Sequence, residues 1–180
     1  MEYVGDGKSK IMVGLILSLI GGLIPYIGSF IAFIGSILVL FGIRIIAKAA
    51  EYPRPFYLYL LNVILGLIFG ILIILNWDAV QKMSFSAIWF LLWLILIVEG
   101  CIQAVVWLDM GKITNVRLFN TGAVILLIGN FLFVIIIGVF ILLVAQIILI
   151  VASSQIPDYI AQYQEWMKSK ITVETFTENL

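Results

Sequence analysis

The chain has 180 residues, of which 64% are hydrophobic and 11% are charged, and its formal net charge is zero. Soluble domains are about 45–50% apolar and about 25% charged, so this composition indicates an integral membrane protein with the lipid bilayer as its main partner. A neutral chain without a basic tract also argues against nucleic acid as a partner.

The first long apolar run covers residues 11–43, which are 33 residues without a charge. One helix of that length would measure about 50 Å, whereas the hydrocarbon core of a bilayer is about 30 Å thick. The pair Gly21-Gly22 comes shortly before Pro25, and proline disfavours helix in the residue that precedes it. We therefore predict a hairpin of two spans, about residues 10–24 and 28–47.

Two spans of ordinary length and a second long run make up the rest of the apolar sequence. The two spans cover about residues 56–75 and 85–108. The run from 118 to 157 has 40 residues without a charge, so it must double back for the same reason as the first. We predict spans at about 118–135 and 138–156.

These spans predict an all-α fold, a polytopic membrane helix bundle with six transmembrane helices arranged as three hairpins over residues 1–156. With both termini cytoplasmic, nine Lys and Arg residues lie inside and only Lys82 lies outside, whereas a four-span alternative places five on each side. The positive-inside rule favours six spans, and we expect the plasma membrane as the location. A re-entrant hairpin, which enters the bilayer and returns, gives the same count and stays open for both long runs.

Small residues recur at intervals of seven in both long runs, except for an interval of nine residues at the turn of the second run. Seven residues are close to two helical turns, so each series draws a stripe of small residues along its helix. In membranes, small residues let helix backbones approach closely. We predict that these glycines pack the helices: Gly14, Gly21, Gly28, Gly35 and Gly42 in the first run, Gly66 and Gly70 in the third span, and Gly122, Gly129 and Gly138 in the second run.

The segment from 157 to 180 has a different character. Proline and an acidic residue at its start are typical of a helix N-terminus, and the apolar residues that follow fall on one helical face. We predict a cytoplasmic amphipathic helix over about residues 157–169, on the membrane surface or on the bundle, followed by a tail. A straight continuation of the last span into the cytoplasm is the alternative.

The glycine spacing of the first run and the stretch "LFNTGAVILLIGN" at residues 118–130 carry a family resemblance. Over roughly residues 10–152 the chain resembles a small archaeal integral-membrane family catalogued as domain of unknown function 996. The resemblance implies an archaeal origin and several membrane helices. It implies no activity, cofactor or catalytic residue.

One carboxylate falls within a predicted span. Glu99 precedes Asp109 by ten residues, so it lies about 15 Å from the inner membrane edge, where desolvation favours its neutral form. Gln103 follows one turn later on the same face, Gln146 has a similar depth on the sixth span, and Asn130 lies nearer the outer side. One hypothesis is a proton or cation site in this candidate polar group. The alternative is a protonated Glu99 that donates a hydrogen bond between helices, worth about 1 kcal/mol.

Residues that commonly carry catalysis are scarce. The chain has no histidine and one cysteine, Cys101, and it contains no nucleophile–base set, no paired carboxylates and no metal-ligand spacing. The acids Asp6, Asp78 and Asp109 are interpreted as solvated loop charges. We therefore expect neither an enzyme, nor a metal site, nor a cofactor.

Two functional hypotheses remain. The first is a structural or accessory subunit that packs with other membrane protein subunits or forms a homo-oligomer, because the glycine stripes suit close helix packing. The second is a small transporter or channel that uses Glu99 for proton or cation coupling.

Overall fold

The computed structural model describes residues 2–24, 27–75, 87–133 and 136–160. Within these residues the chain is predominantly helical, which confirms the predicted all-α class. Its elements are β1 (Glu2–Tyr3), α1 (Gly5–Leu23), α2 (Gly28–Ala49), α3 (Arg54–Leu75), α5 (Ala87–Thr114), α6 (Leu118–Phe131), α7 (Ile136–Ser154) and β2 (Tyr159–Ile160). The first helix ends at Leu23 and the second begins at Gly28, so the first long run bends where its glycines and proline predict.

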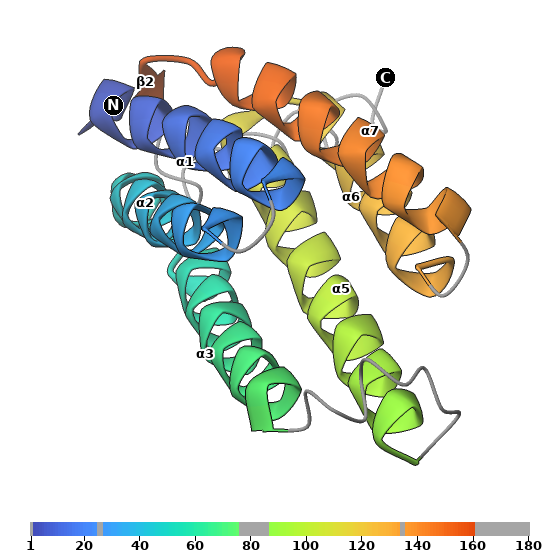
Figure 1. Ribbon diagram of the computed structural model, residues 1–180. Helices are drawn as coiled ribbons and strands as arrows, with labels where there is room; N and C mark the ends of the chain where they lie inside the picture. Colours follow the sequence, from blue (N-terminus) through green and yellow to red (C-terminus); the bar gives the residue numbers. More distant parts are fainter. Residues whose placement is uncertain (1, 25–26, 76–86, 134–135, 161–180) are drawn as a thin grey trace.

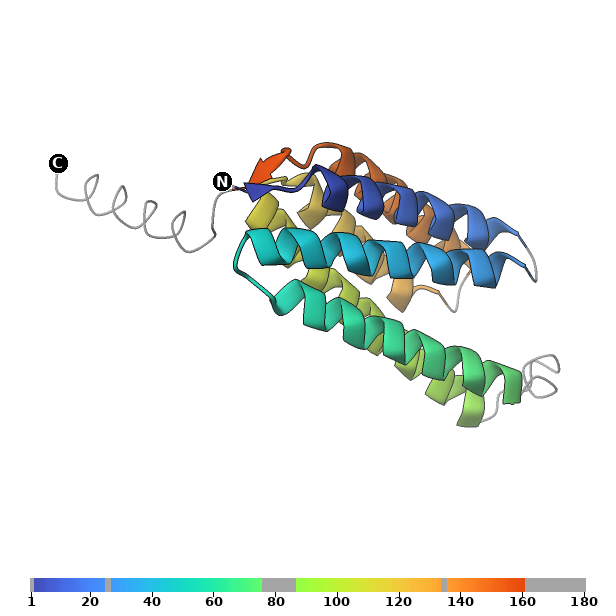
Figure 2. The same ribbon diagram turned by 90° about the vertical axis from the view of Figure 1, so that its left-hand side faces the viewer.

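The helices form a ring in which each packs against its neighbours in the sequence and α7 returns to α1. In Figure 1 the chain can be followed from α1 (blue) to α7 (orange), which lies beside α1 again. The second view, Figure 2, shows α3 and α5 together below α1 and α2. The ring has a charged end, defined as the end where α1, α3 and α6 begin and α2, α5 and α7 end, and an opposite far end.

Charged side chains are concentrated at the charged end. Of the charged residues that the structure describes, Glu99 alone lies elsewhere, in the middle of α5. The others are Asp6, Lys8, Lys10, Arg44, Lys48, Glu51, Arg54, Asp109, Lys112, Arg117 and Asp158. The described part of the chain therefore has a strongly polar end and an apolar body.

Glycines bring α1 and α2 into backbone contact along their whole shared length. A Cβ built on Gly14 would lie 2.5 Å from the carbonyl oxygen of Gly35, and a Cβ on Gly35 would lie 2.5 Å from that of Gly14. The pairs Gly7–Gly42 and Gly21–Gly28 meet in the same antiparallel register. No side chain larger than hydrogen fits at these positions, so the seven-residue spacing places two matching stripes face to face.

The α6–α7 hairpin uses its glycines differently. Gly122 accommodates the side chain of Leu149, and Gly129 accommodates that of Leu142. Each leucine thus fills the space that a side chain on the opposite helix would occupy, and the helices interlock.

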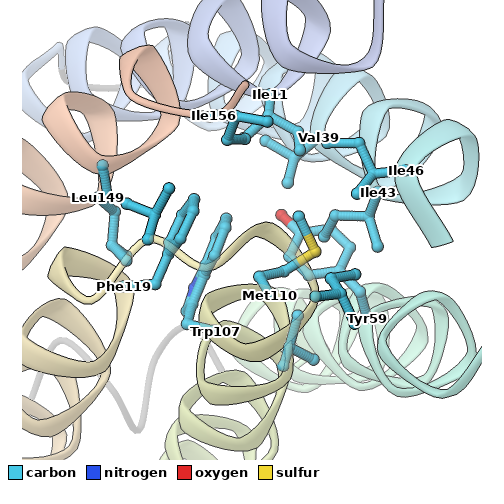
Figure 3. Close-up of a cluster of buried hydrophobic side chains, with 14 of the residues drawn as sticks. Ile11, Val39, Ile43, Ile46, Tyr59, Trp107, Met110, Phe119, Leu149 and Ile156 are labelled. Carbon is cyan, nitrogen blue, oxygen red and sulfur yellow. The ribbon is translucent and has the colours of Figure 1, made fainter. Parts of the chain in front are cut away.

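A hydrophobic cluster closes the ring toward the charged end (Figure 3). Trp107 of α5 stacks on Phe119 of α6, with ring centroids 5.5 Å apart, and meets the edge of Tyr59 of α3 at 6.3 Å. The remaining labelled members come from α1, α2, α5 and α7 and from the segment after α7: Ile11, Val39, Ile43, Ile46, Met110, Leu149 and Ile156. Every helix therefore contributes to one continuous core.

The segment after α7 differs from the prediction. Neither an amphipathic helix nor a continuation of α7 begins at 157, because Tyr159 pairs with Tyr3 in an antiparallel β-bridge and the backbone N–H of Val4 donates to the carbonyl of Asp158 at 2.8 Å. Burial of Ile156 and Ile160 against the core explains this extended path. Residues 161–169 of the predicted helix lie outside the described residues.

Among the described residues, four helices are long and apolar enough to cross a membrane: α2, α3, residues 93–114 of α5 and residues 137–154 of α7. The predicted number of crossings was six. The first turns of α1 carry Asp6, Lys8 and Lys10, and α6 has 14 residues, so the apolar length of each is only about 20 Å. These two helices lie alongside the longer α2 and α7, respectively.

Candidate functional site

A cavity of about 250 Å³ lies in the interior of the ring, and all six described helices line it. Its polar side chains come from different helices: Ser18 from α1, Ser36 from α2, Tyr59 from α3, Gln103 from α5, Asn130 from α6 and Gln146 from α7. Leu15, Trp107, Leu126, Leu142 and Leu149 form its apolar walls. No charged side chain is among these lining residues.

Two serines fix the wall formed by α1 and α2. The hydroxyls of Ser18 and Ser36 both donate to the carbonyl oxygen of Ala32, at 3.3 and 3.1 Å. Both hydroxyls are brought to one carbonyl because the glycine contacts hold α1 and α2 so close together. The oxygen of Ser18 keeps its capacity to accept a hydrogen bond, whereas the Ser36 hydroxyl also interacts with the Tyr59 side chain.

Two amides line the opposite side. The Nε2 atom of Gln146 donates to the carbonyl oxygen of Leu15 at 3.3 Å, which joins α7 to its neighbour α1. The Nδ2 atom of Asn130 donates to the carbonyl oxygen of Leu126 at 3.0 Å, and its amide packs over Gly100 of α5. Each amide keeps a carbonyl oxygen and one N–H.

Gln103 differs from these groups. Among the described residues its amide has no hydrogen-bond partner, yet it lines the cavity. A primary amide offers two donors and an acceptor with two lone pairs. Gln103 therefore supplies the largest free hydrogen-bonding capacity in the cavity wall.

Of the candidate polar group, the structure brings Gln103, Asn130 and Gln146 to one cavity and leaves Glu99 outside its lining. The Glu99 side chain points to α3, where its Oε1 atom would lie 3.3 Å from a Cβ built on Gly66. This oxygen is buried and has no hydrogen-bond partner among the described residues. The spacing of four residues predicted that Glu99 and Gln103 lie on one face of the helix. In the structure, Glu99 on that face contacts α3, whereas Gln103 lines the cavity.

The G-x-x-x-G pair of α3 makes no close backbone contact with the other described residues. A Cβ on Gly66 would meet only the Glu99 oxygen, and a Cβ on Gly70 would meet nothing within 4 Å. The described residues therefore place no helix backbone against this pair, and close packing at Gly66 and Gly70 stays a prediction. The carboxylate of Glu99 fills the space beside Gly66, and α3 projects away from the ring at Gly70.

The interpretation of Asp109 as a solvated loop charge is also wrong. Asp109 is only 1% exposed. Its carboxylate lies 3.4 Å from Nε of Arg54 and 3.7 Å from Nζ of Lys112. The pair with Lys112 has the i, i+3 spacing that the sequence shows, but Arg54 is far away in the sequence, and only the packing of α3 on α5 brings it near.

Sequence reasoning missed three polar residues of the cavity: Ser18, Ser36 and Tyr59. In the sequence, each of these residues stands out only as a polar side chain within an apolar helix. Such residues are also common in helices that form no site. The described residues contain no group of three or more His, Cys, Asp or Glu side chains that could hold a metal ion.

Comparisons with known proteins bear on the second half of the ring. No curated protein and no solved structure matches the chain. A family model matches residues 80–147, a stretch that runs through α5 and α6 into α7 and includes Glu99, Gln103, Asn130 and Gln146. The family is described as Protein of unknown function (DUF996), and the resemblance to domain of unknown function 996 is thereby confirmed over these residues.

Proposed function

We propose that the protein is a six-span membrane protein of the plasma membrane that acts as a structural or accessory subunit and carries out no catalysis of its own. The observation that carries this proposal is an arm formed by residues 63–75 of α3 and 87–98 of α5, which leaves the ring. In this role the ring is the anchor in the bilayer, and the arm packs with other membrane subunits or with a second copy.

The orientation rests on the charged end. Seven of the Lys and Arg residues lie there: Lys8, Lys10, Arg44, Lys48, Arg54, Lys112 and Arg117. Positively charged residues accumulate on the cytoplasmic side of membrane proteins, so we assign the charged end to the cytoplasm. The strand pairing of Tyr3 with Tyr159 holds both ends of the described chain on that side.

The assignment of six crossings is supported by the packing of each short helix along a longer one. The glycine contacts run from Gly7–Gly42 to Gly21–Gly28, so α1 follows α2 from one end to the other. If α2 crosses the bilayer, α1 crosses with it, and local thinning of the bilayer accommodates its shorter apolar length. The same argument applies to α6 beside α7.

The arm has the features of a contact surface for another helix. Within the described chain the buried residues of α3 are confined to its first turns: Pro55, Tyr59 and Asn62. Beyond them α3 and α5 pack against each other, and large apolar side chains such as Ile71 and Phe90 are exposed. Gly70 leaves an open stretch of backbone, and a glycine in a membrane helix permits close approach by a neighbour.

Two glycines that are both free of contacts test this proposal. The protein carrying Gly70→Leu should lose its larger assembly when membranes are solubilised in mild detergent and resolved by native electrophoresis. Gly22→Leu is the matched control, because a Cβ on Gly22 also meets nothing within 4 Å, and it should leave the assembly intact. Migration of the unmodified protein as a lone monomer would contradict the proposal.

A transporter that uses Glu99 is the second candidate, because Glu99 Oε1 is buried in the middle of α5 without a hydrogen-bond partner in the described chain. This function predicts that Glu99→Gln abolishes proton or cation flux in proteoliposomes. The accessory function predicts that Glu99→Gln leaves the assembly and the thermal stability unchanged, since an amide of the same size keeps the contact with Gly66.

A further inference from the structure

We infer that the central cavity binds a small uncharged molecule that carries both hydrogen-bond donors and acceptors, of the amide, urea or polyol class. This site goes beyond the proposed function and does not depend on it, because the cavity lies inside the ring and the arm lies outside. The inference rests on the volume of the cavity, the hydrogen-bonding capacity of its wall and the absence of charge in its lining.

The volume suits a small molecule. The space of about 250 Å³ exceeds many times the volume of about 30 Å³ that one water occupies in the liquid. Drug-sized ligands occupy sites of about 300–1,000 Å³, so this partly open cavity suits a compact molecule or about eight waters. Leucines and the Trp107 ring form apolar walls around the polar groups, as in other small-molecule sites.

The hydrogen bonds within the wall leave a defined set of free groups. Ser18, Ser36, Asn130 and Gln146 each donate to a backbone carbonyl, which holds these side chains in place. The Ser36 hydroxyl is also engaged with the Tyr59 side chain, so the oxygens of Ser18, Asn130 and Gln146 remain as acceptors, and the two amides each keep one N–H. Gln103 adds donors and an acceptor with no partner in the described chain. A ligand that both donates and accepts satisfies this set, whereas a purely apolar ligand leaves it unsatisfied.

The lining favours an uncharged ligand. An ion that enters a site without an opposite charge loses its hydration shell and forms no ion pair in return, so its binding is unfavourable. The nearest acids on α5 do not supply one, because Asp109 is paired with Arg54 and Lys112, and Glu99 points to Gly66. Amides, ureas and polyols need no such partner.

The site can be tested with purified protein in lipid nanodiscs and saturation-transfer NMR. Acetamide, urea and glycerol serve as test ligands, and potassium and methylammonium serve as competing ions. We expect saturable binding of at least one neutral ligand, and its dissociation constant should rise about tenfold or more in Gln103→Leu. This variant removes no hydrogen bond within the described chain, so its fold should persist. Gln146→Leu should also weaken binding, although it breaks the bond to Leu15.

Gln155→Leu is the matched control, because Gln155 is an exposed glutamine just after α7, outside the cavity lining. It should bind the test ligands as tightly as the unmodified protein. Three outcomes would overturn the inference: no saturable binding of any neutral ligand, so that only water fills the cavity; equal affinity in Gln103→Leu and Gln155→Leu; or displacement of the neutral ligand by potassium or methylammonium. If Gly70→Leu loses the larger assembly but still binds the neutral ligand, the cavity site is supported independently of the proposed function.

Discussion

Gly14 and Gly35 lie face to face between α1 and α2, with the backbone of each helix occupying the space that a side chain on the other would need. The same relationship repeats one heptad away on either side, at Gly7–Gly42 and Gly21–Gly28. A backbone atom cannot swing away as the end of a flexible side chain can. These contacts therefore make the first hairpin a rigid unit on which the cavity wall is built.

Enlarging Gly14 should separate the two helices. In Gly14→Ala the added methyl group would meet the carbonyl oxygen of Gly35 at 2.5 Å, and overpacking of this kind costs about 1–3 kcal/mol. Gly22→Ala is the matched control in the same helix, since nothing lies within 4 Å of its Cβ position, and its stability should be unchanged or higher. Thermal unfolding in detergent compares the two. Equal melting temperatures would show that the helices do not approach this closely.

Removing the cations around Asp109 should destabilise the charged end. The carboxylate is buried, whereas the Arg54 and Lys112 side chains are more than half exposed, so loss of both leaves a buried charge without compensation. The double variant Arg54→Gln/Lys112→Gln should lower the melting temperature by several degrees, and each single variant should lower it less. Lys48→Gln, an exposed lysine at the same end, should have no effect. A double variant as stable as Lys48→Gln would contradict this role of the two cations.

The pairing of β1 with β2 should be detectable by cross-linking. Tyr3 and Tyr159 are register partners, with ring centroids 5.6 Å apart. In a Cys101→Ser background, Tyr3→Cys/Tyr159→Cys should form an intrachain disulfide under mild oxidation, visible as a mobility shift without reductant. Tyr57→Cys/Tyr159→Cys is the control and should remain reduced, because Tyr57 lies on α3. If Tyr3→Cys/Tyr159→Cys shows no mobility shift, β1 and β2 do not pair as the structure shows.

The parts of this fold that the sequence predicted depend on short-range patterns. The glycines around Pro25 located the first turn, and the interval of seven indicated which faces of α1 and α2 carry small residues. Hydropathy and length located each described helix, with ends that differ from the predicted spans by up to six residues. Turn positions, helix faces and span lengths do not depend on how the helices pack, because they follow from the period of the helix and the thickness of the bilayer.

The parts that were missed depend on how distant helices cross. The partner of Asp109 comes from α3, and the sequence could not show that Arg54 would reach it. Likewise, Glu99 and Gln103 are one turn apart, yet one faces α3 and the other faces the cavity. The path after α7 follows from the burial of Ile156 and Ile160 beside β1, a contact between the two ends of the described chain.

The orientation of the ring in the membrane is the central claim, and labelling of single cysteines in intact cells tests it most directly. In a Cys101→Ser background, Ile27→Cys lies at the far end, whereas Lys48→Cys and Arg117→Cys lie at the charged end, and all three native residues are exposed. A membrane-impermeant maleimide should label Ile27→Cys from outside and should reach the other two only after permeabilisation. Protection of Ile27→Cys from outside, or labelling of Arg117→Cys in intact cells, would contradict six crossings with a cytoplasmic charged end.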